Sequence, residues 1–244
     1  MNADLQIVVA FRMLPESVWN MPPLGTINLH GSLLPQYRGA APINWAVING
    51  EKETGVTTFK LKHEIDTGNI LMQESFPIDE NETAGDVHDK MKEIGARVLV
   101  ETVKGIADGT LEESPQSTVN SPQNKDSGSE LLTPNSQLLK HAPKIFTETC
   151  NIDWRRSIDE IQNLIRGLSP FPGAFTELGD KTMKIFRSEK ELSLPTSKTG
   201  RWESDGKTYL KFAAIDGYIL LKDVQLEGKK RMLIEDFLRG YRFV

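Results

Sequence analysis

The sequence predicts an α/β fold class, with a Rossmann-like, mainly parallel sheet domain followed by a small antiparallel β-barrel. Three observations lead to this prediction. The continuous apolar run Leu5 to Phe11 is typical of a central parallel strand buried on both faces. Thr26 to Asn49 then reads as a strand, a loop and a helix start, the arrangement at which open α/β sheets bind ligands. Beyond Gly173, short apolar stretches alternate with turn residues, which indicates an antiparallel domain.

The elements of the first domain follow from Pro and Gly positions and from apolar periodicity. They are, in order, a short helix opened by Pro15 and Glu16, a strand Thr26 to Leu29, a helix from Pro42 to about Ile48, strands Gly55 to Lys62 and Ile70 to Ile78, and a helix from about Gly85 to Ile106. We expect Thr83 to cap this last helix. Its apolar side chains recur on one stripe, at Val87, Met91, Ile94, Val98 and Val103.

A change of composition separates the two domains. From Glu113 to about Ser136 the chain is rich in Ser, Pro, Gln and Asn, as in a linker. We therefore expect domains at 1–112 and 140–244 with a linker at 113–139. In the second domain, Ser157 to Leu168 is predicted to be an amphipathic helix, and Asp216-Gly217 is the strongest hairpin signal. Ile234 to Gly240 is expected to close the domain as a short helix.

Bulk composition excludes several classes of protein. The 244 residues are 38% hydrophobic and 26% charged, as in a soluble globular protein. A net charge of -5 argues against non-specific coating of nucleic acid, although Pro195 to Val244 is basic. One cysteine excludes an internal disulfide and a Cys-based metal cluster. No apolar run approaches the roughly 20 residues that span a bilayer, so we expect no membrane partner and a cytoplasmic location.

A candidate site lies around Asn28 and His30. Residues two apart in a strand face the same side, so an amide and an imidazole are expected next to each other. Small residues from Gly39 onward allow the backbone to approach a ligand. Asp66 is expected nearby because it lies in the loop after the next strand. From the residues alone, the polar pair could be catalytic or could satisfy backbone groups.

The motifs resemble those of the folate-dependent formyltransferases, and specifically of the methionyl-tRNA formyltransferase family. The residues that carry the resemblance are Asn28-Leu29-His30, Ser32 to Pro35, Tyr37 to Ile43, Thr54 to Thr57, Asp66-Thr67-Gly68, Ala142 to Ile145, Ile165-Arg166-Gly167, Pro170 to Gly173 and Val224 to Lys230. The resemblance covers the chain from Ala3 to Val244. It implies a formyltransferase domain followed by an OB-like domain that binds tRNA.

The resemblance also implies the activity, which is transfer of the formyl group of 10-formyltetrahydrofolate to the free amino group of methionyl initiator tRNA, for initiation of translation. This reaction needs a donor for the oxyanion and a base for the proton of the amine. By resemblance, His30 is the acid, base and oxyanion donor, Asn28 is a second donor, and Asp66 holds the imidazole or relays the proton.

The remaining site residues are also implied by the resemblance. The folate-binding residues are Ser32, Leu33, Leu34, Pro35, Thr67 and Gly68. The tRNA-binding residues are Arg38, Lys207, Lys229, Lys230 and Arg231. The expected partners are the folate co-substrate and methionyl initiator tRNA, with the protein a monomer. No metal is expected, because His63, His88 and His141 lack metal-ligand spacing.

The resemblance begins partway into the family pattern. Members carry roughly 70 earlier residues, whose absence would leave Leu5 to Phe11 as an unpaired apolar edge. We therefore expect an incomplete enzyme whose activity is weak or nil. Three alternatives are a sugar N-formyltransferase, a glycinamide ribonucleotide formyltransferase and a non-catalytic RNA-binding fragment. The second domain favours the tRNA enzyme over the other two formyltransferases.

Overall fold

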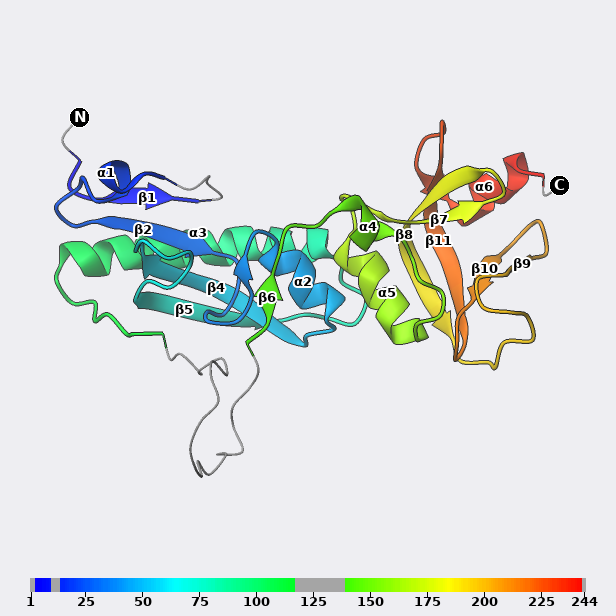
Figure 1. Cartoon of the computed structure of the whole chain (residues 1–244), viewed down its shortest axis with the longest axis horizontal. Coiled ribbons are helices and arrows are strands. Elements are labelled where there is room, and N and C mark those ends of the chain that lie inside the picture. The colour runs from blue at the N-terminus through cyan, green and yellow to red at the C-terminus, as the bar shows by residue number, and fades with distance from the viewer. Residues whose placement is uncertain (1–2, 10–13, 117–138, 243–244) are drawn as a thin grey trace, which may run out of the picture. The chain divides into compact units, whose positions relative to one another are not determined.

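A computed structural model, shown in Figure 1, describes residues 3–9, 14–116 and 139–242. The helices are α1 Glu16–Trp19, α2 Pro42–Ile48, α3 Ala84–Ala107, α4 Thr147–Cys150, α5 Ile158–Gly167 and α6 Ile234–Gly240. The strands are β1 Gln6–Val8, β2 Thr26–His30, β3 Arg38–Gly39, β4 Glu53–Lys60, β5 Ile70–Pro77, β6 His141–Ala142, β7 Ala174–Leu178, β8 Lys181–Glu191, β9 Trp202–Ser204, β10 Leu210–Ala213, β11 Tyr218–Leu226 and β12 Met232–Leu233. Most of the predicted linker lies outside the described residues.

The chain divides into two compact units that are not continuous in sequence. The first unit takes in residues 1–42, 54–76 and 90–143, and the second takes in residues 43–53, 77–89 and 144–244. The first unit therefore holds β1, β2 and most of β4, β5 and α3. The second unit holds every strand from β7 to β12.

A four-stranded sheet in the order β1-β2-β4-β5 forms the centre of the first unit. Strand β1 pairs in parallel with β2, whereas β4 runs antiparallel to β2 and places Thr57 opposite His30. Figure 1 shows α3 lying along this sheet. Gly95 allows the close approach, since an added Cβ there would lie 3.0 Å from Leu29 Cδ2.

The apolar run at the start of the chain lies at an edge of the sheet, as the resemblance predicted, and is not the central, doubly buried strand that its composition alone indicated. Among the described residues, β1 is an edge strand, and β2 is its partner in the sheet. Ile7 and Val9 are consequently 44% and 53% exposed. A continuous apolar run favours burial on both faces, but that burial requires elements packed over each face, and Ile7 and Val9 lack such cover among the described residues. Ala10 and Phe11 lie outside the described residues.

The second unit contains the predicted antiparallel domain, as a six-stranded sheet in the order β7-β8-β11-β10-β9 with β12 beside β11. Every pairing in it is antiparallel. The Asp216-Gly217 hairpin is confirmed, since Ala213 lies opposite Tyr218. Helix α5 is also confirmed, and Ser157 and Glu160 cap it reciprocally. Its apolar face packs into the core of the unit, where Trp154 is also buried.

Two of the residues that carry the resemblance hold the second unit together. The Arg166 side chain is 5% exposed and donates hydrogen bonds to Asn163 Oδ1 at 2.8 Å and to the carbonyl oxygen of Glu82 at 3.1 Å. Burial lowers the pKa of the Arg166 guanidinium. An added Cβ at Gly167 would lie 2.5 Å from Ile48 Cγ1, so only glycine allows α2 to pack this closely.

Candidate active site

Strand β2 carries both polar residues of the predicted site in the first unit. Asn28 and His30 are 4% and 7% exposed, so their polar groups have left water and need partners. The Asn28 amide nitrogen donates a hydrogen bond to the carbonyl oxygen of Val8, 3.1 Å away on the edge strand β1. That bond fixes which end of the amide faces β1.

The imidazole of His30 lies between a carbonyl and a carboxylate. Its Nε2 is 3.0 Å from the carbonyl oxygen of Tyr37. A carbonyl oxygen can only accept, so Nε2 carries a proton. The other ring nitrogen, Nδ1, lies 3.9 Å from Asp66 Oδ2 and presents a lone pair to that side in the neutral ring. The Phe59 ring stands nearly perpendicular to the imidazole, with a centroid distance of 6.4 Å.

Asp66 lies in a loop that is held by three hydrogen bonds from two residues. Its backbone has a φ of +55°, a conformation that Asn and Asp tolerate better than most residues. The Asp66 Oδ2 atom accepts a hydrogen bond from the Gly39 amide at 3.1 Å. The Gln116 side chain donates to the carbonyl oxygens of Asp66 at 2.9 Å and Gly68 at 2.8 Å. The structure therefore brings Asp66 to His30, as predicted.

The predicted folate loop is organised by the buried hydroxyl of Thr57, to which sequence analysis assigned no role. Thr57 Oγ1 donates to the carbonyl oxygen of Ser32 at 2.7 Å and accepts from the Leu34 amide at 3.1 Å. The Gln73 side chain donates to the carbonyl oxygen of Leu34 at 2.9 Å. The remaining residues assigned to folate belong to this loop or to the Asp66 loop, and they are Leu33, Pro35, Thr67 and Gly68.

The basic residues predicted to contact tRNA occur in both units. The first unit holds Arg38, and the second holds Lys207, Lys229, Lys230 and Arg231. Arg231 pairs with Asp223, whose oxygens lie 3.0 and 2.9 Å from its Nε, and its guanidinium lies 4.2 Å from the centre of the Phe186 ring. The three lysines are exposed, and no ion pair joins Lys229 or Lys230 to the described residues.

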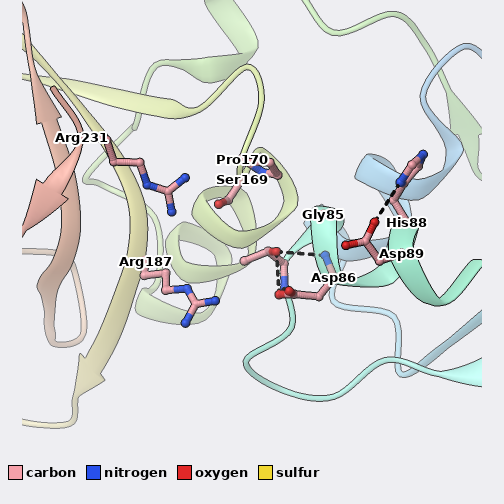
Figure 2. Close-up of a pocket in the computed structure, with 9 residues that line it drawn as sticks. Gly85, Asp86, His88, Asp89, Ser169, Pro170, Arg187 and Arg231 are labelled. Carbon is pink, nitrogen blue, oxygen red and sulfur yellow. Dashed lines mark hydrogen bonds and ion pairs between the residues drawn. The ribbon is translucent and has the colours of Figure 1, made fainter.

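A pocket of about 340 Å³ lies in the second unit, away from all the predicted catalytic and folate residues. Figure 2 shows Arg187 and Arg231 on one side and Asp86 on the other. The Asp86 carboxylate caps α3 by accepting from the Thr83 amide at 2.9 Å. Burial opposes its charge, but the Thr83 hydrogen bonds and nearby Arg187 leave the pKa of Asp86 below its ordinary value. The pocket thus has mixed charge, and Arg231 is the one predicted site residue in it.

Other chemistry finds little support in the described ranges. No group of three His, Cys, Asp or Glu side chains there could hold a metal ion. Cys150 is buried, which raises the pKa of its thiol. No helix in the described part of the chain has both the length and the apolar character that a membrane crossing requires.

Comparison with known proteins defines the class and then the family. The formyl transferase family model matches residues 1–103, and the formyl transferase C-terminal domain model matches residues 144–242. The chain therefore carries both the N-terminal and the C-terminal domain of a formyl transferase. Methionyl-tRNA formyltransferase of Azobacteroides pseudotrichonymphae is 52% identical over 252 residues, covering 100% of this chain and 73% of the relative. The protein of the same name from Phocaeicola vulgatus is 52% identical, covering 99% and 72%. The chain belongs to the methionyl-tRNA formyltransferase family.

Solved structures agree on the fold. HypX from Aquifex aeolicus in complex with tetrahydrofolic acid has a TM-score of 0.68 at 19% identity, covering 99% of this chain and 41% of HypX. An N-formyltransferase from Helicobacter canadensis has a TM-score of 0.60 at 24% identity, covering 80% of this chain and 65% of the other. The predicted fold class is thereby confirmed. The formyl transferase family takes its one-carbon group from 10-formyltetrahydrofolate.

Sequence reasoning missed two residues that organise the site, Thr57 and Gln116. Thr57 is part of the Thr54 to Thr57 motif, so the motif itself was a signal for it. Gln116 lies in the stretch whose composition indicated a linker, yet its side chain is 9% exposed and reaches the Asp66 loop. Nothing in the local composition indicates that contact.

Proposed function

We propose that this chain transfers the formyl group of 10-formyltetrahydrofolate to the amino group of methionyl initiator tRNA. The observation that carries the proposal is the placement of His30 between the Tyr37 carbonyl and the Asp66 carboxylate. An imidazole whose Nε2 proton is held by a carbonyl, and whose Nδ1 lies beside a carboxylate, can accept a proton at Nδ1. The family membership supplies the reaction for which that proton transfer is needed.

In this proposal the amine attacks the formyl carbon, and the carbonyl oxygen becomes an oxyanion. Asn28 donates to that oxygen through the second N–H of its amide, since the first is bound to Val8. His30 and Asp66 take up the proton that the amine loses. The proton then leaves with the nitrogen of tetrahydrofolate when the carbon–nitrogen bond of the donor breaks, so that charge and atoms balance.

The two loops beside the pair hold the folate. Ser32, Leu33, Leu34 and Pro35 form one wall, with backbone groups fixed by Thr57. Thr67 and Gly68 form the other, beside Asp66. Arg38, Lys207, Lys229, Lys230 and Arg231 contact the phosphates of tRNA, each through a salt-dependent interaction.

The domain organisation proposed with this function is a catalytic domain at 1–112, a linker at 113–139 and a tRNA-binding domain at 140–244. The protein acts as a monomer in the cytoplasm. Gel filtration with light scattering tests the monomer, because a dimer would run at twice the 27.3 kDa of the chain.

The test is transfer of labelled formyl from 10-formyltetrahydrofolate to methionyl initiator tRNA. This chain is assayed beside His30→Ala, with His88→Ala as the control because His88 is an exposed histidine of the second unit. Turnover that is lost only in His30→Ala supports both the reaction and the residue. Equal turnover in all three proteins would remove His30 from the mechanism.

The same assay separates the alternative reactions. An amino-sugar nucleotide and glycinamide ribonucleotide are offered as acceptors in place of the tRNA. Formylation of either one, without formylation of the tRNA, would replace the proposed substrate. Binding of tRNA by residues 140–244 without binding of folate by the whole chain would instead favour an RNA-binding fragment.

A further inference from the structure

We propose that Gln116 and Arg38 form a brace that positions Asp66 beside His30. Neither brace residue touches the reacting atoms, so both are positioning residues. The inference rests on the proposed role of Asp66 in formyl transfer. It adds for Arg38 a contact within the protein to the contact with tRNA that the sequence indicated.

The side-chain amide of Gln116 is fully used by this brace. Its nitrogen donates to the carbonyl oxygens of Asp66 and Gly68, at 2.9 and 2.8 Å. Its oxygen accepts from the Arg38 guanidinium, whose Nε lies 3.2 Å away. The two N–H donors of Gln116 thus face two carbonyl oxygens, and its oxygen faces the Arg38 guanidinium. If the amide were turned over, its oxygen would face the carbonyl oxygens and its nitrogen the guanidinium, and every bond would be lost. With 9% of its surface exposed, Gln116 cannot replace these bonds with water.

The Asp66 loop needs such support because its backbone is in an unfavourable region. A non-glycine residue at a φ of +55° persists only where its surroundings hold it. Gln116 holds the backbone of the loop, and the Gly39 amide holds the carboxylate at 3.1 Å. Together they fix Asp66 Oδ2 at 3.9 Å from His30 Nδ1.

Arg38 and Gly39 both act from β3, and β3 is itself fixed. It pairs in parallel with β6, and an added Cβ at Gly39 would lie 2.4 Å from the carbonyl oxygen of Ala142. Gly39 reaches Asp66 directly, whereas Arg38 reaches it through Gln116. Two adjacent residues of one short strand therefore set the position of one carboxylate.

Gln116→Glu distinguishes this brace from a simple partner for Arg38. The substitution keeps the shape of the side chain and strengthens its pairing with the Arg38 guanidinium. It removes both N–H donors and places a carboxylate against the carbonyl oxygens of Asp66 and Gly68. If Gln116 only served to accept the hydrogen bond of Arg38, the variant would be as active as the original chain. The brace predicts instead a loss of about 10- to 100-fold in kcat, the usual range for a residue that orients another.

The experiment combines activity with amide hydrogen exchange at Gly39, whose N–H is bound to the Asp66 carboxylate. We expect Gln116→Glu to accelerate exchange at Gly39 towards the rate in Asp66→Ala, and to add nothing to the kcat defect of Asp66→Ala. Gln162→Glu is the control, since Gln162 is 7% exposed in α5 of the second unit. It should leave Gly39 exchange unchanged.

The outcomes separate this inference from the proposed function. If the Gly39 amide exchanges at the same rate in Gln116→Glu as in the original chain, the brace is overturned, whatever the activity of the variant. Faster exchange at Gly39 with no turnover in the original chain supports the brace and tells against the proposed function. A kcat defect that multiplies with that of Asp66→Ala shows that Gln116 acts other than through Asp66, which also overturns the brace.

Discussion

Replacing Gly68 by alanine should lower formyl transfer by about two orders of magnitude. An added Cβ would lie 1.5 Å from the carbonyl oxygen of Lys60 and 2.7 Å from its carbon. Since that carbonyl belongs to the backbone of β4, the loop must move by roughly 2 Å to restore an ordinary contact. Asp66 is two residues away in the same loop. A displacement of about 1 Å in a catalytic group lowers turnover by roughly 10²-fold, which is about 2.7 kcal/mol in the barrier.

The assay is single-turnover formyl transfer with Gly68→Ala, and Gly240→Ala serves as the control. Gly240 has no atom within 4 Å of an added Cβ and lies at the end of α6. Thermal unfolding of both variants shows whether the loss of rate exceeds any loss of stability. A rate for Gly68→Ala within about threefold of the original chain would refute the argument that this loop sets the geometry of Asp66.

Three further outcomes are expected. Reversing the charges of Lys229 and Lys230 should raise KM for tRNA and make this KM less dependent on salt concentration, whereas Lys104→Glu should change neither. The same dependence of KM on salt in the variant and the original chain would exclude the two lysines from tRNA binding. The pKa of Asp205 lies well below its ordinary value because a threonine hydroxyl and three backbone amides donate to it, so its contribution to stability is present at neutral pH. The stability gap between the original chain and Asp205→Ala should thus narrow as the pH of urea titrations falls below about 4, and a constant gap would contradict this. Trp154→Phe should lower the free energy of unfolding by about 1 to 3 kcal/mol, because a buried threonine hydroxyl loses the hydrogen bond at 2.9 Å. Urea denaturation measures this free energy, and an unchanged value would mean that the hydroxyl finds another partner.

Elements that depend on local signals were well predicted from the sequence. The helix at Pro42–Ile48 and the helix at Ile234–Gly240 have the expected bounds. The capping threonine Thr83 also accepts a hydrogen bond from the Asp86 amide, at 3.2 Å. Caps, turn residues and apolar stripes act within a few residues, so the sequence displays them directly.

What the sequence could not predict depends on contacts between distant residues. The span from Arg38 to Gln116 is 78 residues, and no periodicity or turn chemistry connects the two. The prediction that Arg38 contacts tRNA rests on a cation within a binding motif, and no local pattern indicates that its guanidinium also bonds Gln116. The edge position of Ile7 was predicted only from the resemblance, since an apolar run by itself gives no information about how many neighbours its strand has.

The hydrogen bond from Asn28 to the carbonyl oxygen of Val8 couples the pairing of β1 with β2 to the binding of a ligand at Asn28. Edge strands open more readily than central ones, and when β1 separates from β2 the Asn28 amide loses the contact that fixes its rotation. A ligand whose oxygen binds the Asn28 amide must then fix the rotation of that amide again, and the free energy needed for this lowers the affinity of the ligand. By reciprocity, occupancy at Asn28 and pairing of β1 favour each other by the same free energy. Protection of the β1 amides from exchange should therefore rise and fall with occupancy of the site.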